Sequence, residues 1–345
     1  MDSSIVLILV QDGVVNGAIY ALLALSLVLV FTVTRVVFIP QGEFVAYGAL
    51  TFAGLQAGTL PGSLGLLCVL GLAAFLASLW AARREITLRG VLGLAGGTLV
   101  LPAAITGLAA LAAPRAPGVL VDALLALLIV TPISSYLYRV AFRPIARASV
   151  LVLLIVAVGV HLAMTGLGLV FFGPEGASAS GFTEASFDFG DVPVAGQSLW
   201  VVGLAAALML GLSLFFGHTL TGKALRATAV NRLGARLVGI GTARSGEIAF
   251  TLAGAIGALS GVLIVSLTTI YYDTGFLIGL KGFTAAIVGG MASYPVAALA
   301  AIGVGILESF ASFWASAFKE VIVFTAIIPV LLWRSLRQTG VEEEE

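Results

Sequence analysis

Long apolar runs, each near the length that crosses a lipid bilayer, constrain this chain more than any other feature. The run from Val119 to Val130 with its flanks is one example, and similar runs follow one another along most of the 345 residues. A helix needs about 20 apolar residues to cross the hydrocarbon core. Only 10% of the residues are charged, against about a quarter in a soluble domain. The sequence therefore predicts an all-α, polytopic membrane protein.

Eleven apolar segments are predicted to be membrane helices. They cover residues 5–31, 41–58, 62–82, 88–113, 119–141, 149–172, 198–218, 246–271, 276–291, 295–313 and 319–335. Two of them, 41–58 and 276–291, are short and rich in glycine, and each is expected either to cross the membrane or to form a broken, re-entrant helix. The predicted fold is thus a transmembrane bundle of nine to eleven segments in a single domain, residues 1–345.

Basic residues are concentrated in a few connections between these segments. They are Arg83, Arg84 and Arg89; Arg139, Arg143 and Arg147; Lys223, Arg226, Arg232, Arg236 and Arg244; and Arg334 and Arg337. The 174–197 loop instead holds acidic residues and no lysine or arginine: Glu175, Glu184, Asp188 and Asp191. Cytoplasmic loops carry the excess of lysine and arginine. We therefore expect the acidic loop outside the inner membrane and, with eleven crossings, the N-terminus outside and the C-terminus in the cytoplasm.

The longest basic connection, residues 219–245, is predicted to contain a cytoplasmic helix. Thr221 can cap a helix that begins at Gly222, and Gly239 can end it. Asn231 and Gly234 can divide it into two short helices. Two interpretations are open: an interfacial helix that extends its arginines to anionic lipid, or a docking element for a cytoplasmic partner.

The sequence of this connection resembles a known one. GKALRATAVNRLGARLVGI, residues 222–240, is similar to the cytoplasmic coupling loop of branched-chain amino acid ABC transporter permeases of the LivH type. Further similar stretches are residues 16–31, 41–44, 141–144, 171–176, 250–263, 275–299 and 319–333. Together they cover most of residues 10–58 and 119–335. Residues 59–118, joined by the basic RREITLR loop, look like an insertion of two spans.

The resemblance implies an ABC importer permease-like fold and a role as a pore-forming subunit. It further implies a second homologous permease subunit, two cytoplasmic ATP-binding subunits and an extracytoplasmic solute-binding protein. No GxxxxGK[ST], HExxH or CxxC pattern occurs, so neither a catalytic residue nor a cofactor is expected in this chain. Membrane lipid is an expected partner and nucleic acid is not. The family's relatives carry branched-chain amino acids, urea and amides, and the sequence does not choose among them.

The residues expected to contact the ATPase lie in the 219–245 connection. Short side chains let a helix enter a groove on the partner, and arginines pair with acidic groups at its rim. The candidates are Arg226, Asn231, Arg232, Ala235 and Gly239. For each arginine, a solvated or lipid-facing charge is the alternative.

The solute path is expected beside the two glycine-rich segments. Broken helices expose backbone polar groups, which a membrane protein tolerates only beside a cavity or inside packed protein. Paired discontinuous helices often form transporter sites. The candidates are Gln41, Gly42 and Glu43 in the first segment, and Gly279, Lys281, Thr284, Gly289 and Gly290 in the second.

Four ionisable residues lie in or beside predicted spans, and three of them have more than one interpretation. Glu43 is either a partner for a solute's ammonium group or a helix-start carboxylate stabilised by the helix dipole. Lys281 extends to the interface, pairs with Asp273 or lines the pore. His161 relays protons or is a packed residue hydrogen-bonded to a neighbour, and Glu308 is expected to pair across a helix contact.

Two other function classes remain as alternatives. An ion-coupled secondary transporter would use Glu43, His161 or Glu308, but buried ionisable groups are scarce and the basic connection is long. A membrane-embedded enzyme lacks a convergent set of His, Asp or Cys residues. Gly254, Gly257 and Gly261, at spacings of three and four, instead predict a helix face for close packing.

Overall fold

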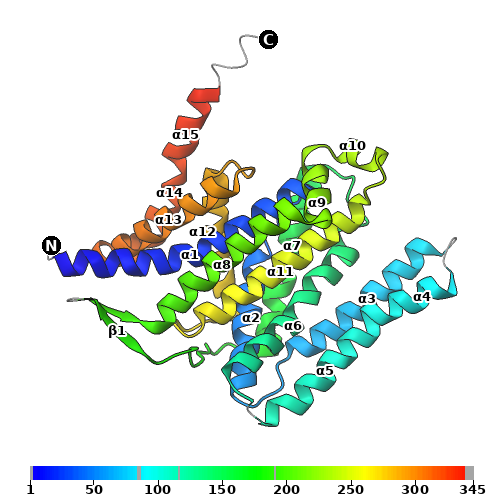
Figure 1. Ribbon diagram of the computed structural model, residues 1–345, viewed down its shortest axis with the longest axis horizontal. Coiled ribbons are helices and arrows are strands. Elements are labelled where there is room, and N and C mark those ends of the chain that lie inside the picture. The colour runs from blue at the N-terminus through cyan, green and yellow to red at the C-terminus, as the bar shows by residue number, and fades with distance from the viewer. Residues whose placement is uncertain (1–2, 84–86, 116, 190–191, 339–345) are drawn as a thin grey trace.

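The computed structural model describes residues 3–83, 87–115, 117–189 and 192–338, which form a bundle of long helices (Figure 1). Arg84 and Asp191 lie outside the described residues. In this part of the chain, eight helical runs are long and apolar enough to cross a membrane. They are α1 (Ser3–Thr34), α3 (Ser63–Ala82), the α4–α5 run (Leu88–Arg115), the α6 run (Val119–Phe142), α7 (Val150–Phe172), α8 (Gly196–His218), α11 (Thr242–Ile264) and α13 (Tyr294–Trp314). The prediction of a polytopic helical bundle is confirmed.

Shorter elements complete the chain. The α4–α5 run consists of α4 (Leu88–Ala95), a π-helical turn (Gly96–Val100), α5 (Leu101–Ala112) and a 3-10 turn (Ala113–Arg115), while the α6 run joins α6 (Val119–Leu137) to a π-helical turn, η3 (Tyr138–Phe142). The remaining helices are α2 (Gln41–Gln56), α9 (Leu220–Val230), α10 (Arg232–Leu237), α12 (Thr274–Val288), a 3-10 turn (Ser316–Phe318), α14 (Lys319–Thr325) and α15 (Ile327–Gln338). Strands β1 (Ser186–Phe189) and β2 (Val192–Ala195) pair antiparallel.

The bundle has two distinct ends, which we call the hairpin end and the loop end. The hairpin end contains residues 173–195, and Ala177 there pairs with Ile270, which follows α11. The loop end contains α9 and α10, and near it Phe216 of α8 stacks on Tyr294 of α13 at 5.8 Å between ring centroids. Helices α8 and α13 each run between these two ends.

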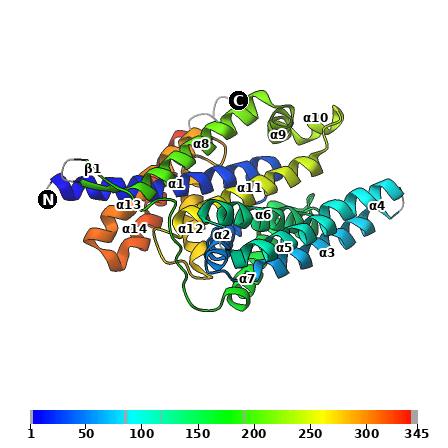
Figure 2. The ribbon, with the colours of Figure 1, turned by 60° about the horizontal axis from the view of Figure 1, so that its bottom comes forward.

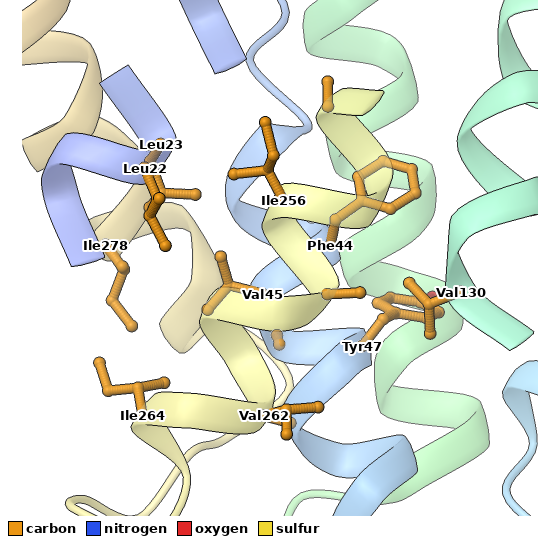
Figure 3. Close-up of a cluster of buried hydrophobic side chains, with 14 of the residues drawn as sticks. Leu22, Leu23, Phe44, Val45, Tyr47, Val130, Ile256, Val262, Ile264 and Ile278 are labelled. Atoms are coloured by element: carbon orange, nitrogen blue, oxygen red, sulfur yellow. The ribbon is translucent and has the colours of Figure 1, made fainter. Parts of the chain in front are cut away.

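Helix α11 lies at the centre because its small face admits close neighbours. A Cβ atom at Gly254 would lie 2.5 Å from Ser134 Cβ on α6, and one at Gly261 would lie 2.1 Å from the Val45 carbonyl oxygen on α2. Figure 3 shows side chains of α1, α2, α6, α11 and α12 gathered in this region. The predicted packing role of Gly254, Gly257 and Gly261 therefore operates within this chain.

Helices α3, α4 and α5 form one flank of the molecule. Figures 1 and 2 both place them together beside α6 and far from α13 and α14. Tyr136 of α6 donates a hydrogen bond to the carbonyl oxygen of Gly97 at 2.6 Å, and Gly71 lets α3 approach Thr98. The outer faces are apolar and exposed, as lipid contact requires, and include Leu72, Leu76, Trp80, Leu92 and Leu108.

Three predicted boundaries were wrong. Helix α11 ends at Ile264 instead of 271, because turns at 265–268 follow it. The single segment 319–335 is two helices, and α14 ends at Thr325. Pro329 lacks the N–H that would donate to the Thr325 carbonyl in a continuous helix. In the loop at 219–245, the cap is Thr219 and not Thr221: the Thr219 hydroxyl accepts from the Gly222 N–H at 2.9 Å.

Candidate functional site

The two short helices predicted beside the solute path meet at their first turns. A Cβ atom at Gly42 would lie 2.0 Å from the Gly275 carbonyl oxygen, and one at Gly279 would lie 2.9 Å from Gly42 Cα. Neither N-cap residue, Pro40 or Asp273, makes a side-chain cap hydrogen bond. The N-termini of α2 and α12 are thus in contact inside the protein, where their dipoles favour negative charge.

The other uncharged path candidates lie around this contact or farther along α12. Gln41 donates through Nε2 to the Ala253 carbonyl oxygen at 3.0 Å, which fixes it against α11. Thr284 is buried and bonds within its own helix. Gly289 follows α12 and packs on Ala297, while Gly290 adopts φ +69° in the turn to α13. The structure therefore brings Gly42 and Gly279 together and leaves Thr284, Gly289 and Gly290 toward the loop end.

Glu43 is completely buried in the first turn of α2, with 0% exposure. Its Oε1 lies 2.9 Å from Nδ1 of His161 on α7. The His161 ring also stacks on Phe276 of α12, at 4.5 Å between centroids. Of the two interpretations given for His161, the structure shows the packed and hydrogen-bonded one. The pair joins α2, α7 and α12 at the place where the two short helices begin.

Lys281 lies in a second charged cluster that includes residues from α1, α13 and α14. Its Nζ donates to Glu308 Oε1 at 2.6 Å and lies 3.2 Å from Glu320 Oε1. Tyr20 donates to the second oxygen of Glu308 at 2.6 Å. Asp273 is not among the residues that contact Lys281 in this cluster, whereas the expected pairing of Glu308 across a helix contact is present.

A cavity of about 720 Å³ opens above this cluster, toward the hairpin end. One part of its lining is polar, with Asp12, Asn16, Ser198, Ser309 and Ser312 beside the charged cluster, and another part is aliphatic, with Leu9, Val15, Ile264, Leu267 and Ile278. Among the residues predicted to line the path, Lys281 borders this cavity. A mixed lining of this kind suits a small amphipathic solute.

At the loop end, the residues predicted to contact an ATPase hold the loop in shape. Asn231 Oδ1 accepts from the Gly234 N–H at 2.8 Å and so caps α10, as its division into two helices predicted. Arg226 donates to the Phe216 carbonyl oxygen of α8, and Arg232 donates to that of Ala146 at 3.3 Å. Partial burial lowers the pKa of the Arg232 guanidinium below its ordinary value.

Part of the exposed surface of this loop is apolar, beside the exposed side chains of Lys223, Arg236 and Arg244. Ala235 is buried, and Gly239 ends α10 with φ +84°. Four aliphatic side chains on the exposed side of α9 and α10 form what we call the loop patch: Val230 (86% exposed), Leu233 (68%), Leu237 (81%) and Val238 (75%). Exposed aliphatic groups of this kind, flanked by arginines, are typical of surfaces that contact another protein or a membrane.

Sequence reasoning missed Asp12, Asn16, Tyr20 and Glu320 as cavity residues. A signal was present in α1, because residues 12, 16 and 20 are spaced by four and share one helix face. It also missed the loop patch. Leu225 on α9 is buried, whereas Leu233 and Leu237 on α10 are exposed. The two helices separate at Asn231, so one continuous helical pattern does not distinguish these faces.

Comparison with known proteins gives the family. Residues 85–332 match the family described as branched-chain amino acid transport system, permease component. The chain belongs to this permease family. The permease BraD of Pseudomonas aeruginosa is 30% identical over 257 residues, which are 72% of this chain and 84% of BraD. LivH of Escherichia coli is 30% identical over 203 residues, covering 56% of this chain and 65% of LivH. A probable LivH of Methanocaldococcus jannaschii is 28% identical over 230 residues, 63% of this chain and 73% of that protein.

The LivH-type resemblance is therefore confirmed, and the chain is a multi-pass permease of the inner membrane with a transport role. The family match contains α9, α10, α12, α13 and α14, and thus the loop patch and one side of the cavity. It begins at residue 85, within the segment 59–118. The assignment of that segment as an insertion stays a prediction, as do the roles of the individual path and coupling residues.

Proposed function

We propose that this permease is one half of the translocation path of an ATP-driven importer for branched-chain amino acids or related small polar solutes. A second homologous permease completes the path, two cytoplasmic subunits hydrolyse ATP, and an extracytoplasmic protein delivers the solute. The relatives' names, which describe branched-chain amino acid transport permeases, support this assignment.

The observation that carries the proposal is the loop patch. Val230, Leu233 and Leu237 are held away from the bundle by two short helices whose ends are capped and whose arginines bond to the chain's own carbonyl groups. Ordering exposed aliphatic side chains in this way is unfavourable in water without a partner that covers them. A cytoplasmic ATPase with an apolar groove is the partner that an importer supplies.

The orientation expected from the charges supports the same assignment. The hairpin end carries the acidic loop and the loop end carries most of the arginines, so the positive-inside rule predicts a cytoplasmic loop patch and a cavity toward the outside. A delivered solute and an ATPase would then approach opposite ends of the protein.

The test is co-purification of the tagged chain from its native membranes. We expect the unmodified chain to bring down an ATPase pair and a second permease. The double variant Leu233→Asp, Leu237→Asp is expected to lose the ATPase and to keep the second permease, because it places charge in an apolar contact. Leu60→Asp, the same change at an exposed leucine between α2 and α3, is the matched control and should keep both.

Two results would overturn parts of the proposal. An ATPase retained by the double variant would show that the loop patch does not dock it. Recovery of the unmodified chain alone after gentle solubilisation, with solute uptake by that chain in proteoliposomes without ATP, would favour an ion-coupled transporter in place of an importer subunit.

A further inference from the structure

The charged groups around the cavity do not balance. Three carboxylates line it, Asp12, Glu308 and Glu320, and two ammonium groups, Lys281 and Lys319. Lys281 binds Glu308 closely, whereas its distance to Glu320 is longer, 3.2 Å against 2.6 Å. Within the described residues, the second oxygen of Glu320 has no hydrogen-bond partner. Lys319 Nζ lies farther from Glu320, at 4.0 Å from the same Oε1. Glu320 therefore has only long ion pairs, both through Oε1, and an Oε2 that is free to accept a further donor.

We propose that the cavity binds the zwitterionic head of a free aliphatic α-amino acid through Lys281 and Glu320. The carboxylate of the ligand takes the place of Glu320 at Lys281 Nζ, and Glu320 turns to accept the ligand's ammonium group. The exchange keeps the number of ion pairs on Lys281 and gives Glu320 Oε2 a donor, which it does not have in the structure. Charge-assisted hydrogen bonds on both ends of the ligand provide the recognition.

The side chains of the cluster differ in exposure, and we infer different roles for them from this difference. Lys281 and Glu308 have side-chain exposures of 6% and 9%, and Tyr20 fixes Glu308 from α1. Glu320 is 32% exposed and lies in the first turn of α14, so its side chain can change partner without opening the core. Glu308 and Tyr20 are positioning residues, and Lys281 and Glu320 contact the ligand.

The rest of the lining fits the other half of such a ligand. Aliphatic side chains from three helices border the cavity: Val15 of α1, Ile264 of α11 and Ile278 of α12. An uncharged aliphatic side chain gains free energy by leaving water for this wall. A solute with only one charge would leave either Lys281 or Glu320 without its new partner. The lining therefore selects zwitterions over amines and acids of the same shape.

The test measures binding by protection of a cysteine. In a Cys68→Ser background, Ser312→Cys places a thiol in the cavity lining one turn beyond Glu308 on α13. The full chain in lipid nanodiscs is treated with a small methanethiosulfonate reagent, and the rate of modification is followed with increasing L-leucine. The probes 4-methylpentanoate and 3-methylbutylamine have the same aliphatic shape with one charge each.

We expect L-leucine to slow the modification and the two single-charge probes not to. Glu320→Gln keeps the pair of Lys281 and Glu308 and is expected to raise the half-protecting concentration of L-leucine about tenfold or more. Lys281→Met should abolish protection, and Glu184→Gln, at an exposed site in the outer loop, should leave it unchanged. Size-exclusion profiles identify any variant that has not folded.

Equal protection by all three probes, or an unchanged half-protecting concentration in Glu320→Gln, would overturn the inference. It rests on the proposed import function for its biological meaning, but the two can fail separately. Protection by L-leucine with no ATP-dependent leucine import by the complete transporter would contradict the proposed function alone. Import without protection would contradict this inference alone.

Discussion

Glu43 and His161 show what a buried carboxylate needs in this protein. The carboxylate is fully buried, and its close contact is a ring nitrogen 2.9 Å away on another helix. Removing one member of a buried polar pair leaves the other with the full cost of its lost hydration. The pair thus contributes to stability mainly through the penalty that would follow its loss.

His161→Ala is therefore expected to lower the free energy of unfolding by about 2–3 kcal/mol. Adding Glu43→Gln to His161→Ala should recover part of the loss, because a neutral amide is less costly to bury unpaired than a carboxylate. Unfolding in mixed detergent micelles measures both. His218→Ala, the same change at an exposed histidine, is the control, and equal stability of the two alanine variants would contradict the prediction.

At this scale the sequence indicated which residues were unusual, but not their partners. Glu43, His161, Lys281 and Glu308 stand out because charged and imidazole groups are rare in apolar runs. The pairing of Glu43 with His161 spans 118 positions, and hydropathy contains no information about which helices touch. Glu320 was missed for the same reason, whereas Tyr20 was missed although its spacing from Asp12 and Asn16 placed the three on one helix face.

At the scale of elements, contact between the first turns of α2 and α12 depends on glycine. A methyl group at Gly42 would lie 2.0 Å from a backbone oxygen of Gly275, and one at Gly275 would lie 2.3 Å from the Gly42 carbonyl oxygen. Backbone atoms cannot rotate away as a side chain can. The two helices would have to separate to admit any larger residue.

Gly42→Ala is expected to destabilise the protein by about 1–3 kcal/mol, the usual cost of overpacking. Gly159→Ala, in α7 with no atom within 4 Å of the added Cβ, is the matched control. It should be neutral or stabilise by up to about 1 kcal/mol, because alanine favours helix. Thermal unfolding in detergent compares the two, and an unaffected Gly42→Ala protein would show that the helices separate at no cost.

Element existence was predictable here and element ends were less so. Every apolar segment predicted from the sequence contains helix in the structure. Apolar periodicity and run length predict which segments leave water, and those segments form the helices. The positions of the helix ends depend on single hydrogen bonds, which the hydropathy of a segment does not reveal. Thr219 caps α9 in place of Thr221, and the missing N–H of Pro329 ends α14.

At the scale of the whole molecule, the distribution of charge predicts how the bundle lies in the membrane. Arginines at the loop end and acids at the hairpin end predict that the loop end faces the cytoplasm. The pairing of α1 with α13, from opposite ends of the sequence, was beyond sequence reasoning, because periodicity describes one helix at a time. The two segments that form α2 and α12 were both expected beside the solute path, although their direct contact was not.

Cysteine labelling in intact cells tests this orientation. In a Cys68→Ser background, Glu184→Cys is expected to react with a membrane-impermeant maleimide added outside, because it lies exposed in the acidic loop. Arg244→Cys, exposed near the start of α11, should react only after the membrane is permeabilised. The opposite pattern would contradict the assignment of the two ends.

Helix α8 gives the molecule a mechanical property. Its first turns contribute Ser198 to the cavity, and its last turn holds Arg226 of the loop through the Phe216 carbonyl. Between these points runs an uninterrupted helix of 23 residues, about 35 Å long, with most of its surface free of the bundle. Such a rod joins the loop and the cavity wall within one rigid element, so the shortest covalent route between the two ends lies outside the packed core.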